Sequence, residues 1–324
     1  MPAATPQPGV EIVEVGPRDG LQNEARTLDV DTRIQLIDRL LDQGIRRLET
    51  VSFVHPRRVP QMAGAEEVMA GLPARDDVTY IGLVLNARGA ARAATTQCDE
   101  INIVVPVSDA FAIRNQGVTV EQMFDQTGAS VAIGREAGRG VSVTLAVAFG
   151  CPFSGDVPPG RLAEIVDRVG DLGVDELAFA DTIGVGSPRQ VRELAGLVHG
   201  DPRFNRLRFH FHNTRNTGYA NAAAALELRD DTGRGPLRNS VALDASAGGF
   251  GGCPFAPAAT GNIATEDLLY LLRREGTPLD GPPLDIEGLA DVGRWLSHHL
   301  DSPVQGLLSR AGTFEPAARS EAAS

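Results

Sequence analysis

The sequence predicts an α/β protein, a (β/α)8 TIM barrel with one additional C-terminal helix. Eight short runs of β-branched or apolar residues recur along the 324 residues, and segments with helical spacing lie between them. Strands that alternate with helices are typical of a parallel sheet, and eight such repeats suffice to close a barrel. The expected strands are Glu11–Val15, Arg47–Val51, Thr79–Leu85, Glu100–Val105, Val141–Ala148, Glu176–Ala180, Arg206–Phe211 and Val241–Ala245.

The intervening helices are indicated by apolar spacing and by residues typical of helix starts. Ser187 precedes Pro188, and this pair favours a helix start because serine caps the first turn and proline suits the first helical position. Thr265–Asp267 opens another helix with acidic residues in its first turn, which the helix dipole stabilises. The expected helices are Asp31–Gln43, Glu66–Ala70, Val120–Ala137, Gly160–Leu172, Pro188–His199, Gly218–Leu228, Thr265–Leu272 and Ile286–Leu300.

An open, doubly wound parallel sheet is the structural rival. That fold usually has fewer strands and a glycine-rich fingerprint after the first one, whereas here the first turn reads Gly16-Pro17-Arg18-Asp19-Gly20. We therefore expect one barrel domain over residues 11–300, which includes the C-terminal helix. A flexible N-terminus (1–10) precedes it and a tail (301–324) follows it. The polar stretch Asp230–Asn239 is expected to be a surface excursion.

Composition excludes several classes of partner. The formal net charge of −12 argues against nucleic acid and against an anionic membrane surface, because both attract clustered basic residues. No apolar stretch is long enough to span a bilayer. The three cysteines, Cys98, Cys151 and Cys253, form neither a CxxC pair nor an even set, so no disulfide framework is predicted. A reducing cytoplasm is the simplest expected location.

The chain contains no lysine, so all 30 basic residues counted as lysine or arginine are arginine. Genomic composition bias explains the absence itself. The chemical consequence holds in any case, because Schiff-base aldolases and pyridoxal-phosphate enzymes require a lysine amine. Both classes are therefore excluded.

The sharpest local signal is the pair His210 and His212. Residues at positions i and i+2 of a strand share a face, so both imidazoles point the same way. Two adjacent imidazoles form a natural metal site, although two hydrogen-bonded structural histidines are an open alternative. Asp19 and Asn262 stand at other expected strand ends and can add oxygen ligands. A mixed nitrogen and oxygen shell suits Mg²⁺ or Mn²⁺, with Co²⁺ or Zn²⁺ possible in vitro.

Other polar residues gather at the carboxyl ends of the expected strands, where TIM barrels carry their active sites. Glu49 lies within a strand and needs a partner, for which Arg18 is suitable. Asp181 could be a site residue or only a cap of the next helix. Cys253 follows four glycines within five residues, and a thiol on such a loop is a candidate for acid–base work. Ser52, Ser108 and Thr182 also follow strands.

Several of these residues belong to longer motifs that appear in a characteristic order. Together the motifs run from about Glu11 to about Leu272, and in this respect the chain resembles the hydroxymethylglutaryl-CoA lyases. The motifs are Val13–Glu24, Glu49–Val54 with Val59–Met62, Gly150–Phe153, Asp181–Gly186, Gly251–Phe255 and Gly261–Asp267.

The resemblance implies a role for each candidate. A divalent cation, Mg²⁺ or Mn²⁺, would be bound by Asp19, His210, His212 and Asn262. Arg18 would stabilise the enolate of the departing thioester, Glu49 and Asp181 would orient groups around the site, and Cys253 would transfer a proton. The expected catalytic residues are thus Arg18, Asp19, Glu49, Asp181, His210 and Cys253; substrate contacts are expected from Arg18, Gln22, Ser52, Ser108 and Thr182.

The implied activity is retro-Claisen cleavage of 3-hydroxy-3-methylglutaryl-CoA to acetyl-CoA and acetoacetate, by a homodimer or higher homo-oligomer. One departure from the family pattern concerns Asn213–Arg215, where the mitochondrial enzymes typically have Asp-Thr-Tyr. The departure leaves the expected cation ligands intact but puts the acyl group in doubt. Citramalyl-CoA or a longer branched 3-hydroxyglutaryl-CoA is therefore an alternative substrate. A metal hydrolase on the same fold and a non-catalytic binding protein are less favoured alternatives.

Overall fold

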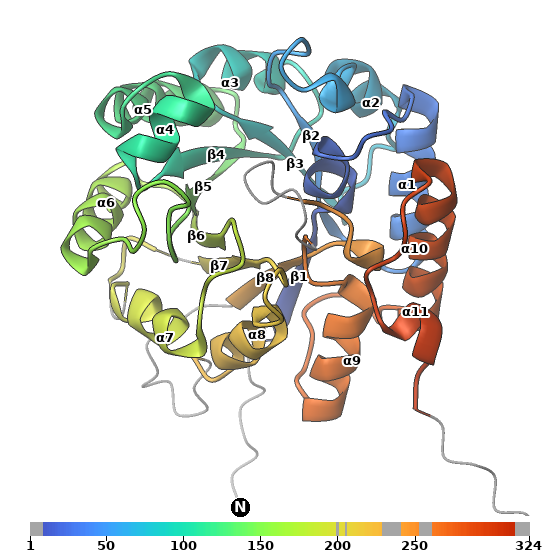
Figure 1. Cartoon of the computed structure of the whole chain (residues 1–324). Helices are drawn as coiled ribbons and strands as arrows, with labels where there is room; N and C mark the ends of the chain where they lie inside the picture. The colour runs from blue at the N-terminus through green and yellow to red at the C-terminus, as the bar shows by residue number, and fades with distance from the viewer. Residues whose placement is uncertain (1–8, 199–200, 205, 229–240, 253–260, 315–324) are drawn as a thin grey trace, which may run out of the picture.

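Eight parallel strands close into a barrel in chain order, so the predicted TIM barrel is confirmed (Figure 1). The computed structural model describes residues 9–198, 201–204, 206–228, 241–252 and 261–314. The strands are β1 (Val10–Glu14), β2 (Arg47–Ser52), β3 (Thr79–Val84), β4 (Glu100–Pro106), β5 (Gly140–Ala146), β6 (Glu176–Asp181), β7 (Arg206–Phe211) and β8 (Val241–Ala245). All eight expected strands are present: β7 and β8 have the expected bounds, and the ends of the other six differ by at most two residues.

Helices surround the barrel (Figure 1). They are α1 (Val30–Asp42), α2 (Ala65–Gly71), α3 (Ala87–Ala94), α4 (Asp109–Gln116), α5 (Val120–Glu136), α6 (Pro159–Asp171), α7 (Pro188–Gly196), α8 (Gly218–Leu226), α9 (Thr265–Glu275), α10 (Ile286–Leu300) and α11 (Leu308–Ala311). The additional C-terminal helix is α10, and its bounds are those expected from the sequence. The sequence analysis did not identify α3, α4 or α11.

Local capping explains where two of these helices begin. Asn86 accepts a hydrogen bond from the Gly89 amide at the start of α3, and the Ser108 side chain accepts one from the Phe111 amide at the start of α4. Asn86 and Ser108 are therefore the N-cap residues of α3 and α4. The expected strand end at Ala148 is wrong by two residues, because Val147 has a φ of 56°, which β structure does not accommodate.

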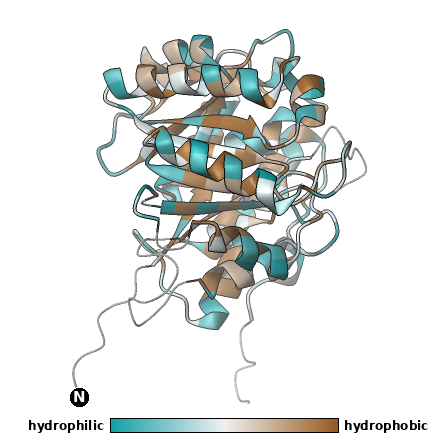
Figure 2. Ribbon diagram, turned by 90° about the vertical axis from the view of Figure 1, so that its left-hand side faces the viewer, coloured by the Kyte–Doolittle hydropathy of each residue, from teal (hydrophilic) through white to brown (hydrophobic). Residues whose placement is uncertain are grey.

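The apolar core lies mainly between the strands and the helices. Hydrophobic residues of the strands and of the inner helix faces pack together, while hydrophilic residues cover the outer helix faces (Figure 2). Inside the barrel, a separate small apolar cluster consists of Val13, Val15, Ile81 and Ala242. Much of the remaining interior is polar or charged, which is unusual for a fold whose barrel is commonly filled by branched apolar side chains.

Backbone hydrogen bonds hold segments near both ends of the described chain. The Val10 amide donates to the Pro278 carbonyl over 2.9 Å, and the Gln305 and Gly306 amides both donate to the carbonyl of Gly248. Residues 1–8 and 315–324 and the predicted excursion Asp230–Asn239 lie outside the described residues. Within the described part, no helix combines the length and the apolar character needed to cross a membrane.

Candidate active site

Four of the predicted site residues meet at one mouth of the barrel. Asp19 lies on a π-helical turn (Gly16–Gly20) after β1, His210 lies on β7, and His212 follows β7 and forms an isolated bridge with Asn262. Asp19 Oδ2 is 3.8 Å from His210 Nε2 and 3.6 Å from His212 Nε2. Asn262 Nδ2 donates to the same Asp19 oxygen over 2.9 Å. The two imidazoles therefore point toward Asp19 and Asn262, as the sequence predicted.

These residues fit a divalent cation. In the described chain, Asp19, His210 and His212 form the cluster of acidic, histidine or cysteine groups suited to a metal, and one ligand atom of each lies within 4.8 Å of the others. Both ring nitrogens of His212 and Oδ1 of Asn262 are buried without a hydrogen-bond partner among the described residues. Buried polar atoms are normally satisfied, so these atoms indicate a missing positive partner. Nitrogen and oxygen donors without a thiolate suit Mg²⁺ or Mn²⁺.

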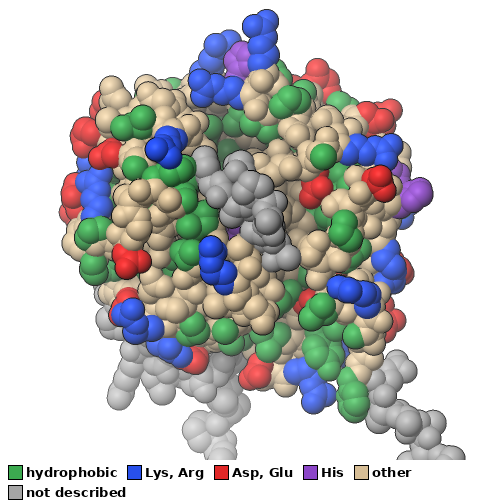
Figure 3. Space-filling view, viewed as in Figure 1, with side chains coloured by type: hydrophobic (Ala, Val, Ile, Leu, Met, Phe, Trp, Pro, Cys, Tyr) green, Lys and Arg blue, Asp and Glu red, His purple; other side chains and the backbone are tan. Residues whose placement is uncertain are grey.

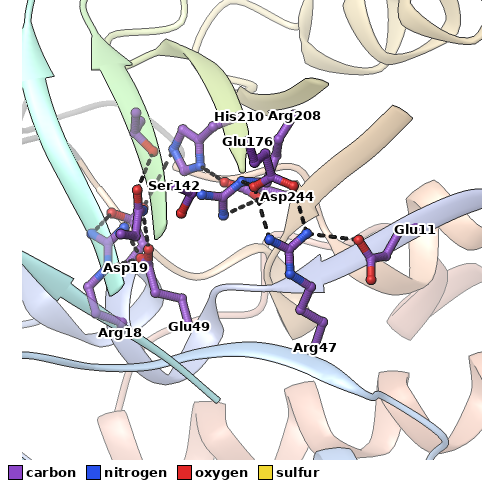
Figure 4. A network of polar contacts seen from close by, with 12 residues as sticks. Glu11, Arg18, Asp19, Arg47, Glu49, Ser142, Glu176, Arg208, His210 and Asp244 are labelled. Atoms are coloured by element: carbon purple, nitrogen blue, oxygen red, sulfur yellow. Dashed lines mark hydrogen bonds and ion pairs between the residues drawn. The ribbon is translucent and has the colours of Figure 1, made fainter. Parts of the chain in front are cut away.

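Arg18 connects Asp19 to a second carboxylate. Its guanidinium forms ion pairs with Asp19 and with Glu49 of β2, and all three side chains are nearly buried (Figure 4). Burial by itself would raise the pKa of Asp19, but Arg18 and the two histidines outweigh it and hold that pKa well below its usual range. Asp19 is therefore an anion at neutral pH. The predicted pairing of Glu49 with Arg18 is confirmed.

The structure adds two residues beside Glu49 that the sequence analysis did not single out. Asn102 of β4 donates to Glu49 Oε2 over 2.6 Å, and Thr144 of β5 donates to Asn102 Oδ1 over 2.9 Å. Both line the cavity described below. Glu49 thus has one oxygen on Arg18 and the other on Asn102, which fixes the guanidinium that faces the cavity.

Asp244 of β8 is a third residue that was not predicted. Its Oδ2 lies 3.1 Å from His210 Nδ1 (Figure 4). Burial would lower the pKa of His210, but the hydrogen bond with Asp244 and the nearby Asp19 charge outweigh it and raise that pKa. The sequence carried a partial signal for Asp244, because an aspartate inside a short strand needs a buried partner. The sequence did not show which residue that partner is.

Asp181 is the last residue of β6, and Thr182 follows it at the same mouth. Asp181 accepts hydrogen bonds from the amides of Val185 and Gly186, and Ser187 is the cap of α7. Asp181 is therefore not the cap of that helix; it organises the loop before it. Burial raises its pKa, although the two amide donors partly oppose the effect. Thr182 lines the cavity, and its hydroxyl accepts from the Val147 amide.

Of the remaining predicted residues, only some reach the cavity that is described below. Gln22 lines the cavity next to Arg18. The structure does not bring Ser52 and Ser108 to this cavity: Ser52 is fully buried, and Ser108 caps α4 and donates to Cys151 Sγ over 3.2 Å. Cys253 lies outside the described residues.

The cluster opens into a cavity of about 1240 Å³. Its inner part is lined by Arg18, Asp19, Asn102, Thr144, Thr182, His210, His212 and Asp244. Its rim carries the exposed arginines Arg58, Arg88 and Arg114, and Figure 3 shows basic side chains around the opening. An acidic protein therefore presents a locally basic entrance above a deep polar site, an arrangement suited to an anionic small molecule.

Comparison with known proteins identifies the family. The HMGL-like family model matches residues 9–295, which is most of the chain. The chain belongs to the HMGL-like family.

Members of the HMGL-like family that resemble this chain are carbon–carbon lyases. The (R)-citramalyl-CoA lyase of Chloroflexus aurantiacus is 39% identical over 318 residues, covering 95% of this chain and 96% of the relative. The hydroxymethylglutaryl-CoA lyase of Pseudomonas mevalonii is 39% identical over 303 residues, covering 94% and 95%. A structure of an HMG-CoA lyase from Acinetobacter baumannii, in complex with coenzyme A and 3-methylmalate, has a TM-score of 0.85 at 34% identity and covers 95% of this chain and 98% of that one.

This HMGL-like chain is therefore a carbon–carbon lyase of a metal-dependent family, with a potential metal site at its barrel mouth. The predicted enzyme class and family are confirmed. The hydrolase and the non-catalytic protein that the sequence left open are set aside by the same comparisons. The substrate is not decided by them, because the two relatives with equal identity have different names.

Proposed function

We propose that this lyase cleaves 3-hydroxy-3-methylglutaryl-CoA to acetyl-CoA and acetoacetate with the help of Mg²⁺ or Mn²⁺. The observation that carries the proposal is the convergence of Asp19, His210, His212 and Asn262 beside Arg18: the histidines, Asp19 and Arg18 line one cavity, and Asn262 contacts Asp19. A divalent cation held by these four residues would act as a Lewis acid and would lower the pKa of the tertiary hydroxyl. The protein's own residues account for the other parts of the reaction.

The reaction requires one proton to leave the hydroxyl and one to arrive at carbon. Asp19 and His210 lie beside each other in this site, with Asp19 Oδ2 3.8 Å from His210 Nε2. We propose that the Asp19 carboxylate takes the hydroxyl proton, because His210 would give its Nε2 lone pair to the cation. The bond between the hydroxyl-bearing carbon and the thioester α-carbon then breaks, and its electron pair forms the thioester enolate. Arg18, fixed by Glu49, stabilises that charge, and Cys253 is proposed to return a proton to the carbon.

Coenzyme A is proposed to enter past the arginines of the rim. Arg58 and Arg88 are exposed, and Arg114 stacks over the Phe153 ring with its guanidinium carbon 4.1 Å from the ring centroid. Guanidinium groups bind phosphate oxygens well, so the arginines of the rim fit the diphosphate and the 3′-phosphate of coenzyme A. The relative crystallised with coenzyme A supports the choice of this substrate class.

A second candidate is (R)-citramalyl-CoA, for which a relative with 39% identity is named. The two substrates undergo the same bond cleavage, but citramalyl-CoA has one methylene fewer between its hydroxyl-bearing carbon and its carboxylate, so it yields pyruvate in place of acetoacetate. A difference of one methylene is worth only about 1–3 kcal/mol in a binding pocket. Kinetic comparison must therefore decide between them.

The test is a panel of thioesters assayed with the chelator-treated protein after addition of Mg²⁺ or Mn²⁺. We expect 3-hydroxy-3-methylglutaryl-CoA to give the highest kcat/KM and acetoacetate as product. A higher kcat/KM for (R)-citramalyl-CoA, with pyruvate released, would replace the proposed substrate and keep the chemistry. If no thioester of the panel were cleaved, the proposal would fail. Light scattering of the same preparation tests the proposed homodimer or higher homo-oligomer.

A further inference from the structure

A chain of buried charges runs through the barrel interior and ends at the candidate cation site. We define this interior charge chain as Arg47, Glu176, Arg208, Asp244 and His210 (Figure 4). Arg47 donates to Glu176 from both terminal nitrogens, and Arg208 Nε lies 2.8 Å from Glu176 Oε1. Arg208 then donates to Asp244 Oδ1 over 3.2 Å, and the other oxygen of Asp244 meets His210 Nδ1.

The register of the barrel makes these contacts possible. Arg208 and His210 are two residues apart on β7, so both side chains point inward, and His210 pairs in register with Asp244 on β8. Glu176 pairs with Arg206 at the opposite end of β7, one inward step before Arg208. The links among Glu176, Arg208, Asp244 and His210 thus connect neighbouring positions on β6, β7 and β8, whereas Arg47 of β2 reaches Glu176 across the barrel interior.

Stability alone is a poor reason to keep such a chain. Arg208 and Glu176 are both fully buried, and removing a charge from water costs several kcal/mol even after relaxation. Apolar side chains fill this space in many barrels, and well-packed apolar replacements of buried ion pairs are often neutral or stabilising. These charges therefore call for a reason other than stability.

His210 and His212 differ in this respect. Asp244 faces Nδ1 of His210, so that nitrogen carries the proton and Nε2 presents its lone pair toward Asp19. The Nδ1 atom of His212, by contrast, has no hydrogen-bond partner among the described residues. The ring of His210 is therefore the one whose tautomer and orientation are set before a cation arrives.

We propose that Asp244 and Arg208 are positioning residues for the cation: Asp244 holds His210 in the tautomer that offers Nε2, and Arg208, anchored on Glu176, holds Asp244. This inference rests on the cation site of the proposed function. The arginine concerned, Arg208, is fully buried and contacts Glu176 and Asp244. Its described contacts include neither the ligand atoms that would face the cation nor the residues expected to contact the substrate.

The test measures binding of Mn²⁺ alone to the chelator-treated full-length protein by calorimetry. We expect Arg208→Met and Asp244→Ala each to weaken Mn²⁺ binding by about 10- to 100-fold, the usual effect of losing a residue that supports a metal ligand. Because Arg208 acts through Asp244, the double variant should bind no more than about two-fold more weakly than Asp244→Ala. Additive losses, or wild-type affinity in Arg208→Met, would overturn the proposal.

Arg33→Met is the matched control. Arg33 is also buried, but it lies on α1 outside the barrel interior and donates to the Ala63 carbonyl. Its replacement should leave Mn²⁺ affinity unchanged, and a loss as large as that of Arg208→Met would mean that general destabilisation is responsible. Where Arg208→Met does not fold, Arg208→Lys decides, since it keeps the charge but loses the forked contact; we expect at least a three-fold weaker affinity, and unchanged affinity contradicts the inference.

Nuclear magnetic resonance of ¹⁵N-histidine-labelled, metal-free protein supplies an independent readout. The signals of His210 are assigned by their loss in His210→Gln. They should report a protonated Nδ1 in the unaltered protein and a mixture of tautomers in Asp244→Ala; the same tautomer in both would contradict the proposed role. If the unaltered protein bound no Mn²⁺ at all, the proposed function would itself be contradicted, a result distinct from binding that is indifferent to Arg208.

Discussion

Asn262 donates a hydrogen bond to Asp19 Oδ2 over 2.9 Å, although 243 positions separate the two residues in the chain. Closure of the barrel makes this contact, because β1 pairs with β8 and the segment after β8 returns to the mouth beside His212. The site therefore exists only in the folded barrel. Its parts can be tested separately.

His212→Ala should weaken Mn²⁺ binding by at least about 100-fold, because the variant lacks one of the four proposed ligands and ligand loss exceeds the effect of losing a supporting residue. The fold should persist, since the ring nitrogens of His212 make only one long contact with a described residue, 3.6 Å from Nε2 to Asp19 Oδ2. Calorimetry measures the affinity and circular dichroism the fold. His298→Ala is the control, because His298 is exposed on α10; equal losses in both variants would refute the assignment.

Gly251→Ala should also disrupt the cation site. Gly251 has a φ of +115°, and a methyl group there would lie 2.5 Å from Asn262 Nδ2 and 3.1 Å from the Asp19 carbonyl oxygen. We expect weaker Mn²⁺ binding by about ten-fold or more, because displacement of Asn262 by a few tenths of an ångström alters the ligand geometry. Gly117→Ala carries a similar backbone strain at φ +79° with no atom within 4 Å, so it should lower stability and leave Mn²⁺ affinity unchanged.

Arg18→Ala should lower kcat by roughly 10²–10³-fold, the usual effect of removing one group that stabilises a developing oxyanion. Because Glu49 and Asp19 lose their common partner, thermal unfolding must accompany the kinetics. A folded variant with near-normal turnover would remove Arg18 from the mechanism.

The rim arginines should affect substrate affinity and not the chemical step. Removing Arg58, Arg88 or Arg114 one at a time should raise KM roughly 3- to 10-fold with kcat preserved, since each contributes about one charge-assisted contact at an exposed site. The effect should shrink as salt is added. Arg161→Ala provides the comparison, because Arg161 is on α6 and pairs with Glu164 away from the cavity.

Glu14 predicts a pH dependence of stability. This carboxyl group is fully buried, and burial raises its pKa from an ordinary 4.5 to about 7. The folded state then binds more protons than the unfolded state between these two values, so stability falls as pH rises from about 4.5 to about 7. We expect Glu14→Gln to remove on the order of 2 kcal/mol of this decline, measured by urea unfolding from pH 5 to pH 8. Identical pH profiles for both proteins would contradict the assignment.

The sequence predicted the strands well because alternating strand and helix patterns repeat eight times, and each repeat supports the same interpretation. It missed α3 and α4 for a physical reason. Each helix has eight residues, and α3 is built mainly from alanine and arginine, so neither gives a long apolar periodicity. Ser108 was assigned to the substrate because its capping role depends on that unrecognised helix.

Within the site, the spacing of residues predicted which side chains of one strand share a face. Contacts between different strands depend on the register of the barrel, which the sequence analysis did not predict. The inward pair His210 and His212 followed from a separation of two residues. Asp244 could not be placed beside His210 without the pairing of β7 with β8, and Arg208 had no stated role until its neighbours Glu176 and Asp244 were known. Long-range contacts between strands therefore account for the residues that the sequence analysis overlooked.

The central claim is that Asp19, His210, His212 and Asn262 bind one divalent cation at the barrel mouth. Anomalous diffraction from crystals soaked in Mn²⁺ tests it most directly. We predict one strong anomalous peak at bonding distance from His210 Nε2, His212 Nε2, an Asp19 carboxylate oxygen and Asn262 Oδ1. Saturating Mn²⁺ that produced no peak among these four residues, or a peak only elsewhere on the protein, would contradict the account.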